Sequence, residues 1–173
     1  NDDIYVSGNL GDSYLGLLVL KNKIKLNPSL KKYFIDQYFM PNIQLRLTDH
    51  IKKFANTSID ISDGLLADLD KMINNQKLSY KLFLKDIPVS NNLKKILKPK
   101  KLSKINCISN GDDYQVLFTA SKDKMRIIKK IAYNYRVKLT KIGSIQSHLK
   151  KPSIIDDKNR QITLKNKGYL HKF

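Results

Sequence analysis

Residues 58–65 read SIDISDGL, and this stretch decides how the chain around it folds. Before it, apolar and polar residues alternate over 57–61, which predicts a strand. After it, the apolar residues of 63–74 recur every three or four positions, which predicts a helix. The period changes within a few residues, so the stretch is a strand-to-helix turn. The inward positions of the helix are Leu65, Leu66, Leu69 and Ile73.

The turn carries two carboxylates and a hydroxyl. Strand alternation predicts Asp60 and Ser62 on one face, and Asp63 is expected in the first helical turn. One interpretation is a helix cap, in which Ser62 accepts from free N–H groups and Asp63 favours the positive end of the helix. A cap does not require Asp60. The other interpretation is a Mg²⁺ and phosphate site, because Mg²⁺ takes carboxylate oxygens together with phosphate oxygens.

Two further loops carry glycine or paired carboxylates. The sequence GNLGD at 8–12 follows a predicted strand and precedes a predicted helix, but it lacks the spacing of the known nucleotide-binding fingerprints. In SNGDDYQVLF at 109–118, Asn110–Gly111 is typical of a turn. The neighbouring Asp112 and Asp113 would repel each other unless one is solvated or bound to a cation. A plain turn and a ligand site both fit each loop.

The remaining elements alternate along the chain. They predict an α+β fold with a single mixed β-sheet and helices packed on it. Strands are expected at 4–7, 57–61, 78–84, 105–108, 114–119 and 137–142 and near Ile154 and Ile162, and helices at 13–23, 28–38, 43–54, 63–74, 91–97 and 121–135.

Composition narrows the class of protein. The chain has 173 residues and is 41% hydrophobic, enough for one domain with a core. Its longest apolar run, Tyr14–Leu20, is too short to span a bilayer, and no signal peptide is visible. Cys107 is the single cysteine, so a cytoplasmic setting is expected. The three histidines are scattered, and nothing indicates a nucleophilic triad.

The formal charge of +18 raises the question of nucleic acid. Only four of the 33 basic residues are Arg, which leaves 29 Lys, and all 15 acidic residues are Asp. Base readout favours Arg, whereas these lysines are spread along the chain. A solvated basic surface is therefore the favoured interpretation, and binding to a polyanion is the alternative.

Four stretches in order resemble one family. They are DDIYVSGNLGDSYLGLLVL at 2–20, ANTSIDISDGLLADLDKM at 55–72, NGDDYQVLF at 110–118 and GYLHKF at 168–173. Together they resemble the C-terminal half of thiamine-monophosphate kinases, which belong with the aminoimidazole-ribonucleotide synthetase-like ATP enzymes. The resemblance covers essentially the whole chain, and IDISDGLLADL is its most specific piece.

The resemblance implies a reaction in which ATP phosphorylates thiamine phosphate to thiamine diphosphate, with several Mg²⁺ ions and a homodimer. It implies Asp60 and Asp63 as Mg²⁺ ligands, Ser62 as an ATP contact, and Asp112 and Tyr169 as contacts to thiamine phosphate. Residues 1–173 then form the C-terminal domain. The N-terminal domain of the family, with most of the Mg²⁺-binding and nucleotide-binding groups, is absent, so the chain alone is expected to be inactive.

The sequence departs from the family pattern near these residues. Asn110 stands where the family has Gly, Asp112 where it has Glu, and Gln115 where it has a later Glu. The segment MPNIQ at 40–44 lacks both arginines of the usual motif. These departures bear on turnover more than on fold.

Two alternatives remain open. One is another ATP-dependent synthetase of the same superfamily, against which SIDISDGLL and the terminal GYLHKF argue. The other is a degenerate, non-catalytic domain that binds a polyanion through a Lys-rich face. Salt-sensitive binding to nucleic acid, without a response to Mg²⁺ or thiamine phosphate, would distinguish the second.

Overall fold

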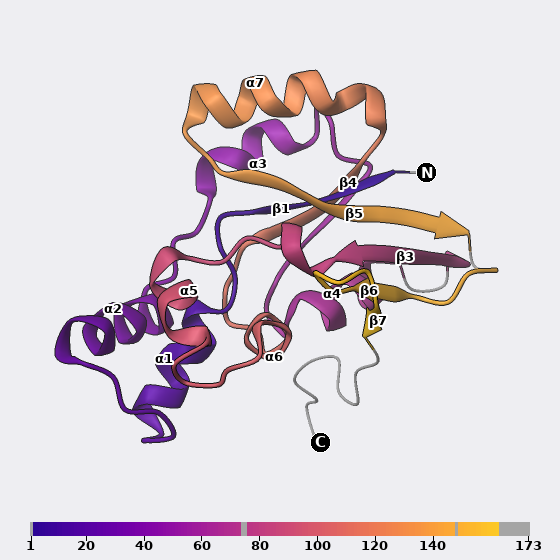
Figure 1. The fold of residues 1–173 in the computed structure, drawn as a ribbon. Coiled ribbons are helices and arrows are strands. Elements are labelled where there is room, and N and C mark those ends of the chain that lie inside the picture. Colours follow the sequence, from indigo (N-terminus) through magenta and orange to yellow (C-terminus); the bar gives the residue numbers. More distant parts are fainter. Residues whose placement is uncertain (1, 74–75, 148, 163–173) are drawn as a thin grey trace, which may run out of the picture.

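The computed structural model describes residues 2–73, 76–147 and 149–162. Within this part, seven strands form one sheet in the order β2-β4-β1-β5-β3-β6-β7 (Figure 1). Neighbouring strands are antiparallel except for β3 and β6, so the predicted mixed sheet is confirmed. The strands are β1 Asp3–Ser7, β2 Thr57–Asp60, β3 Leu78–Phe83, β4 Val116–Ala120, β5 Leu139–Ser147, β6 Ser153–Ile155 and β7 Gln161–Ile162.

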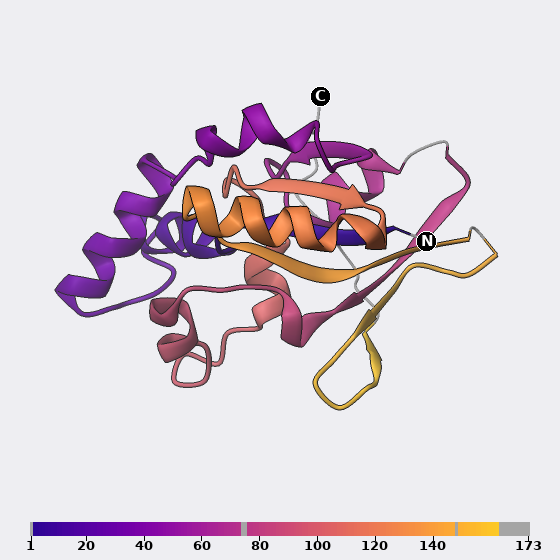
Figure 2. The same cartoon turned by 90° about the horizontal axis from the view of Figure 1, so that it is seen from above.

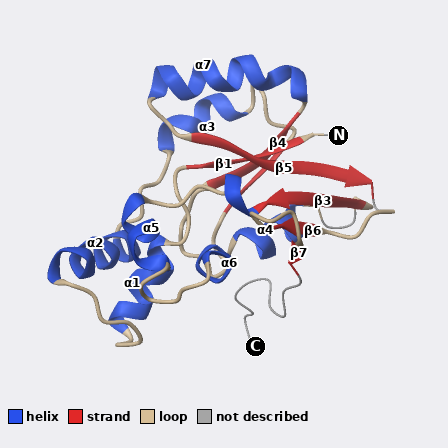
Figure 3. Ribbon diagram, viewed as in Figure 1, coloured by secondary structure: helices blue, strands red, loops and turns tan. Residues whose placement is uncertain are grey.

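Helices pack on both faces of the sheet. Figures 1 and 3 show α3 and α7 on one face and α4 and α6 on the other, with α1, α2 and α5 grouped beyond one end. The helices are α1 Asp12–Leu20, α2 Pro28–Phe39, α3 Leu45–Ile51, α4 Leu65–Met72, α5 Asn91–Leu97, α6 Lys104–Ile108 and α7 Met125–Tyr135, with short 3-10 turns η1 Leu84–Asp86 and η2 Lys122–Lys124.

Strand β1 lies inside the sheet, between β4 and β5, and separates two apolar cores. Tyr5 stacks on Phe118 with ring centroids 5.2 Å apart, and both pack with Leu47 of α3 and with α7. Ile4 and Val6 belong to the larger core on the opposite face. All five residues of β1 are buried, as expected for a strand covered on both faces. This buried strand therefore fixes where the β1–α1 loop leaves the sheet.

Two sequence-based predictions are wrong. The expected strand at 105–108 is helix α6, in which Ile105 and Ile108 are three residues apart and both buried. Over only four residues, the apolar spacing of a strand cannot be told from that of a helix, and packing determined which of the two formed. The strand expected from Tyr114 begins only at Val116, because Tyr114 has a left-handed backbone (φ 48°). The other predicted strands and helices are confirmed with ends that differ by at most four residues, except that β5 continues five residues beyond the predicted end at 142.

The elements that carry the notable loops meet at one end of the molecule. Figure 2 shows α1 and α2 at that end and the β6–β7 hairpin at the opposite one. The N-terminus of α1 contacts the loop that precedes β4, which in turn contacts the turn between β2 and α4. Among the described residues, no helix is both long and apolar enough to cross a membrane.

Candidate functional site

The turn between β2 and α4 differs in detail from the expected cap. Strand β2 is an edge strand that ends at Asp60, and the Asp60 side chain is exposed. Helix α4 begins at Leu65 after Gly64, whose φ of 118° suits glycine, and no side chain caps it at that position. Asp63 therefore precedes the first helical turn, and the prediction that Ser62 caps the helix is wrong.

Asp68 performs the expected capping role instead. Its side chain is fully buried, and Oδ2 accepts from the N–H groups of Ser62, Asp63 and Gly64 at 2.9, 2.9 and 3.1 Å. Lys71 donates to Oδ1 of Asp68 at 2.8 Å and also forms an ion pair with Asp63. One carboxylate thus holds the whole turn in place.

No role was predicted for Asp68 from the sequence, although its spacing carries a signal. Asp68 lies on the same helical face as Leu65, Leu69 and Met72, all of which are buried. A carboxylate on a buried stripe requires hydrogen-bond partners. The free N–H groups at the start of the same helix were the available donors.

The loop before β4 is joined to this turn through its backbone. The N–H of Asp112 donates to the carbonyl of Ser62 at 2.9 Å, and the N–H of Tyr114 donates to the carbonyl of Ile61 at 2.9 Å. Gly111 has a φ of 76°, and a Cβ there would lie 2.1 Å from the Ser62 carbonyl oxygen. Only glycine permits this approach. The two loops therefore place Asp63 and Asp112 at one location.

The paired carboxylates of this loop have different environments. Burial, followed by the nearby negative charge of Asp63, raises the pKa of Asp112. Asp113 is buried, and its two oxygens both accept from the N–H of Gly11, at 2.9 and 2.8 Å. Burial raises the pKa of Asp113 well above its ordinary value, against the opposing effect of that hydrogen bond. Asp112 faces the pocket described below, whereas Asp113 anchors the loop to the start of α1.

Gln115 connects a third loop to the same place. Its Oε1 accepts from the Ser7 hydroxyl at 2.8 Å, and its Nε2 donates to the Asn42 carbonyl at 2.9 Å. A carboxylate could accept from Ser7 but could not donate to Asn42. The amide of Gln115 therefore holds the connector between α2 and α3.

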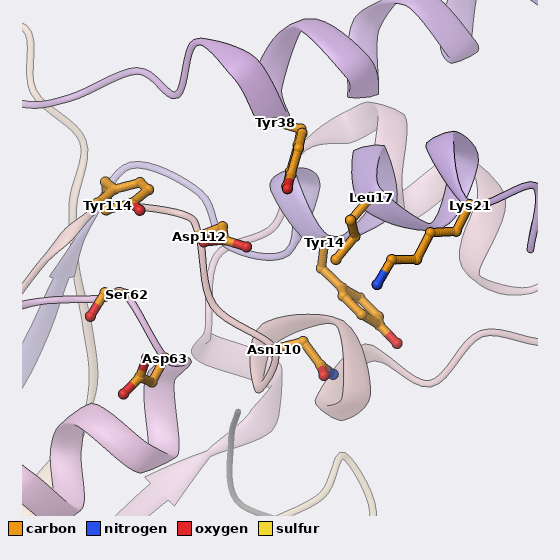
Figure 4. Close-up of a pocket in the computed structure, with 9 residues that line it drawn as sticks. All are labelled: Tyr14, Leu17, Lys21, Tyr38, Ser62, Asp63, Asn110, Asp112 and Tyr114. Atoms are coloured by element: carbon orange, nitrogen blue, oxygen red, sulfur yellow. The ribbon is translucent and has the colours of Figure 1, made fainter. Parts of the chain in front are cut away.

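These loops form one wall of a pocket of about 740 Å³. Figure 4 shows its opposite wall, where Tyr14, Leu17 and Lys21 of α1 and Tyr38 of α2 face the Ser62–Asp63 turn. The carboxylates are thus on one side and the aromatic rings with one ammonium group largely on the other. The complete lining is Tyr14, Leu17, Lys21, Tyr38, Ser62, Asp63, Asn110, Asp112 and Tyr114.

The structure brings three of the five predicted site residues together. Ser62, Asp63 and Asp112 line the pocket. Asp60 is exposed two residues before Ser62 and is not among the lining residues. Tyr169 lies outside the described residues. The roles assigned to these five residues remain predictions.

The donor set fits part of a coordination sphere for a hard cation. Asp63, which is ion-paired with Lys71, and Asp112 present carboxylates to the same pocket, and a cation there would relieve the repulsion that remains between them. Within the described ranges, no group of three or more His, Cys, Asp or Glu side chains is arranged to hold a metal ion. Mg²⁺ at this wall would therefore need oxygens from a phosphate, from water or from another domain.

The chain is similar in sequence to thiamine-monophosphate kinases. No protein-family model matches the chain. It is 36% identical over 175 residues to the thiamine-monophosphate kinase of Buchnera aphidicola subsp. Acyrthosiphon pisum, covering 98% of this chain and 52% of that protein. It is 33% identical over 147 residues to the thiamine-monophosphate kinase of Aquifex aeolicus, covering 84% of this chain and 45% of that protein. The chain spans about half the length of these relatives.

The solved structures that match this chain also do so over about half of their own length. The thiamine-monophosphate kinase of Stenotrophomonas maltophilia K279a superposes with a TM-score of 0.76 at 26% identity, covering 90% of this chain and 50% of that one. A structure described as AaThiL complexed with AMPPCP and TMP gives 0.76 at 27% identity, covering 98% and 51%. Escherichia coli HypE shares the fold alone, at 13% identity and a TM-score of 0.71.

Proposed function

Since this chain is a homologue of the thiamine-monophosphate kinases and matches about half of their length, as its sequence predicted, we propose that it is the C-terminal half of such an enzyme. The complete protein would transfer a phosphoryl group from ATP to thiamine phosphate, giving ADP and thiamine diphosphate. Residues 1–173 form the C-terminal domain in this proposal. The other half supplies the remaining nucleotide and Mg²⁺ contacts, and the complete enzyme is a homodimer.

One observation supports this function above others: the pocket joins a carboxylate wall to an aromatic wall. Phosphoryl transfer requires positioning and charge neutralisation more than a protein nucleophile. Ser62 and Asp63 are held by Asp68, so they stand in place before any ligand arrives. The relative described with AMPPCP and TMP holds an ATP analogue and a phosphate ester together, which is consistent with this division of the pocket.

We assign the residues on that wall as follows. Asp60 and Asp63 would hold Mg²⁺, Ser62 would contact ATP, and Asp112 and Tyr169 would contact thiamine phosphate. Mg²⁺ at this position would neutralise charge on the transferring phosphoryl group. Asp60, although exposed, lies three residues from Asp63 at the end of an edge strand, where a second domain can still approach it.

The test is an ADP-release assay on the complete enzyme with ATP, Mg²⁺ and thiamine phosphate. Asp63→Asn should lower kcat/KM by about 100-fold or more, the scale of losing one charge-stabilising contact in a phosphoryl-transfer site. Asp60→Asn should cause a comparable loss. The matched control is Asp49→Asn, because Asp49 is exposed on α3 away from the pocket. Full activity in Asp63→Asn would overturn the assignment.

The Michaelis constants for thiamine phosphate and for ATP distinguish residues that contact the substrate from residues that contact the nucleotide. Asp112→Ala should raise KM for thiamine phosphate more than KM for ATP, because the lost contact belongs to the substrate. A defect confined to the ATP side would reverse that assignment. The proposed homodimer is checked by sedimentation of the complete enzyme, where a monomer at micromolar concentration would contradict it.

A further inference from the structure

A second, polar pocket lies beside the start of α5. It measures about 340 Å³ and shares no lining residue with the pocket described above. Four places in the sequence contribute to it: Asn9 of the β1–α1 loop, Tyr33 of α2, residues between Val89 and Lys94 at the start of α5, and Lys138 just before β5. None of its lining residues within the described ranges is acidic.

The nearest buried carboxylate is closed off from this pocket. Asp12 is buried, and its oxygens accept from the hydroxyls of Tyr33 at 2.8 Å and Ser90 at 2.7 Å. Ser90 in addition accepts from the N–H of Leu93 at 3.0 Å. Both hydroxyl protons are therefore directed toward Asp12 and away from the pocket. The carboxylate is already satisfied by these hydroxyls and does not neutralise the pocket through a direct ion pair.

Two ammonium groups remain at the pocket without a counter-charge. Lys138 donates to Oδ1 of Asn9 at 2.7 Å, which fixes its position. Burial lowers the pKa of Lys138, and the positive charge of Lys94 lowers it further. In the part of the chain that the structure describes, neither lysine forms an ion pair. Lys94 is exposed, but its charge still acts on Lys138, and an anion between the two would relieve their repulsion.

Three side-chain amides at the pocket are also donors. Because Oδ1 of Asn9 is occupied by Lys138, its Nδ2 remains available to donate. The side-chain amides of Asn91 and Asn92 add further donors beside Lys94. Two positive charges with several amide donors match an anion that carries two negative charges and several acceptor oxygens. The small volume favours a phosphate group over an extended polyanion.

We propose that this pocket binds a phosphate group, as inorganic phosphate or as a small phosphomonoester, independently of the phosphoryl-transfer site. The occupant is held by Lys94 and Lys138, with Asn9 orienting Lys138. The site requires neither Mg²⁺ nor nucleotide, because its own charge is positive. If phosphate does not bind in this pocket, the proposed kinase function is unaffected, because the two pockets are lined by different residues.

The experiment titrates inorganic phosphate into the 173-residue chain at constant ionic strength, without Mg²⁺ or nucleotide, and follows ¹H–¹⁵N NMR shifts. Saturable shifts at the amides of Asn9, Asn91 and Asn92 are expected. Lys94→Gln should weaken binding by about tenfold, and Lys94→Gln/Lys138→Gln by more, as charge-assisted hydrogen bonds are lost. A parallel titration with glycerol 2-phosphate distinguishes the two sources, and tighter binding of either ligand supports the site.

The matched control is Lys129→Gln/Lys130→Gln, which removes the same charge from exposed positions on α7. It should leave the phosphate affinity unchanged. An equal loss of phosphate affinity in that control, or shifts that grow linearly without saturation, would mean that the basic chain attracts phosphate without a specific site. Either result would overturn the proposal. Shifts confined to Ser62 and Asp112 would place the phosphate in the first pocket and also overturn it.

Discussion

Both carboxylate oxygens of Asp113 accept from the backbone N–H of Gly11, at 2.9 and 2.8 Å, so a buried acid joins the loop before β4 to the start of α1. Burial raises its pKa well above the ordinary value. The same direction holds for Asp12 and Asp112, again with burial as the largest cause. The native state therefore retains protons at these sites to higher pH than the unfolded chain does.

The first prediction concerns pH. A carboxyl with a raised native pKa contributes stability that is fully present below its unfolded pKa of about 4 and is lost as pH rises through the native pKa. As pH rises from about 4 toward neutrality, the unmodified chain should therefore lose unfolding free energy relative to the Asp113→Asn variant. Urea denaturation at several pH values measures this change.

The control is Asp156→Asn. The pKa of Asp156 is lowered, chiefly by a hydrogen bond from the Arg160 N–H, so its contribution to stability should change with pH in the opposite direction. A pH-independent difference for Asp113 would contradict the assignment.

The second prediction concerns the β2–α4 turn. Asp68→Ala leaves three N–H groups without their acceptor and removes a buried partner of Lys71. Leaving a buried N–H group without its acceptor costs about 1–3 kcal/mol, and the loss of the half-exposed Lys71 contact adds little. Asp68→Asn keeps an acceptor oxygen and should cost less. Denaturant unfolding gives the values, and Asp49→Ala at an exposed position should change stability little. A loss for Asp68→Ala no larger than that of the control would show that the turn does not depend on this carboxylate.

The third prediction concerns the connector between α2 and α3. Gln115→Glu keeps the acceptor for Ser7 but points a carboxylate oxygen at the Asn42 carbonyl, beside buried Asp113. An unfavourable buried contact of this kind costs about 1–3 kcal/mol at neutral pH. Stability should recover at acid pH, where the new carboxyl is protonated and can donate. Gln161→Glu, an exposed change on β7, should show neither effect.

The sequence predicted the local elements better than the contacts between loops. The change of period around 57–74 is a local signal, and β2 and α4 follow it. The bond of Asp68 to Ser62 is local, and its signal is a carboxylate on the buried face of α4. The bond of Asp113 to Gly11 depends on how distant segments pack, and no local pattern encodes it. The left-handed backbone at Asp112 is likewise imposed by its hydrogen bond across to the Ser62 carbonyl. Sequence therefore indicated which loops matter, and packing determined how their side chains point.

The last prediction is that the 173-residue chain folds but does not catalyse by itself. Its two apolar cores lie on either side of one sheet, which suffices for independent folding. The pocket offers Ser62, Asp63 and Asp112 on one wall, too few groups to orient ATP and neutralise its charge. An ADP-release assay with ATP, Mg²⁺ and thiamine phosphate should show no turnover until a separately made N-terminal half is added. With Asp63→Asn in the mixture, activity should again be absent, which ties the gain to this wall. Robust thiamine diphosphate formation by the chain alone would mean that a complete site exists within these residues.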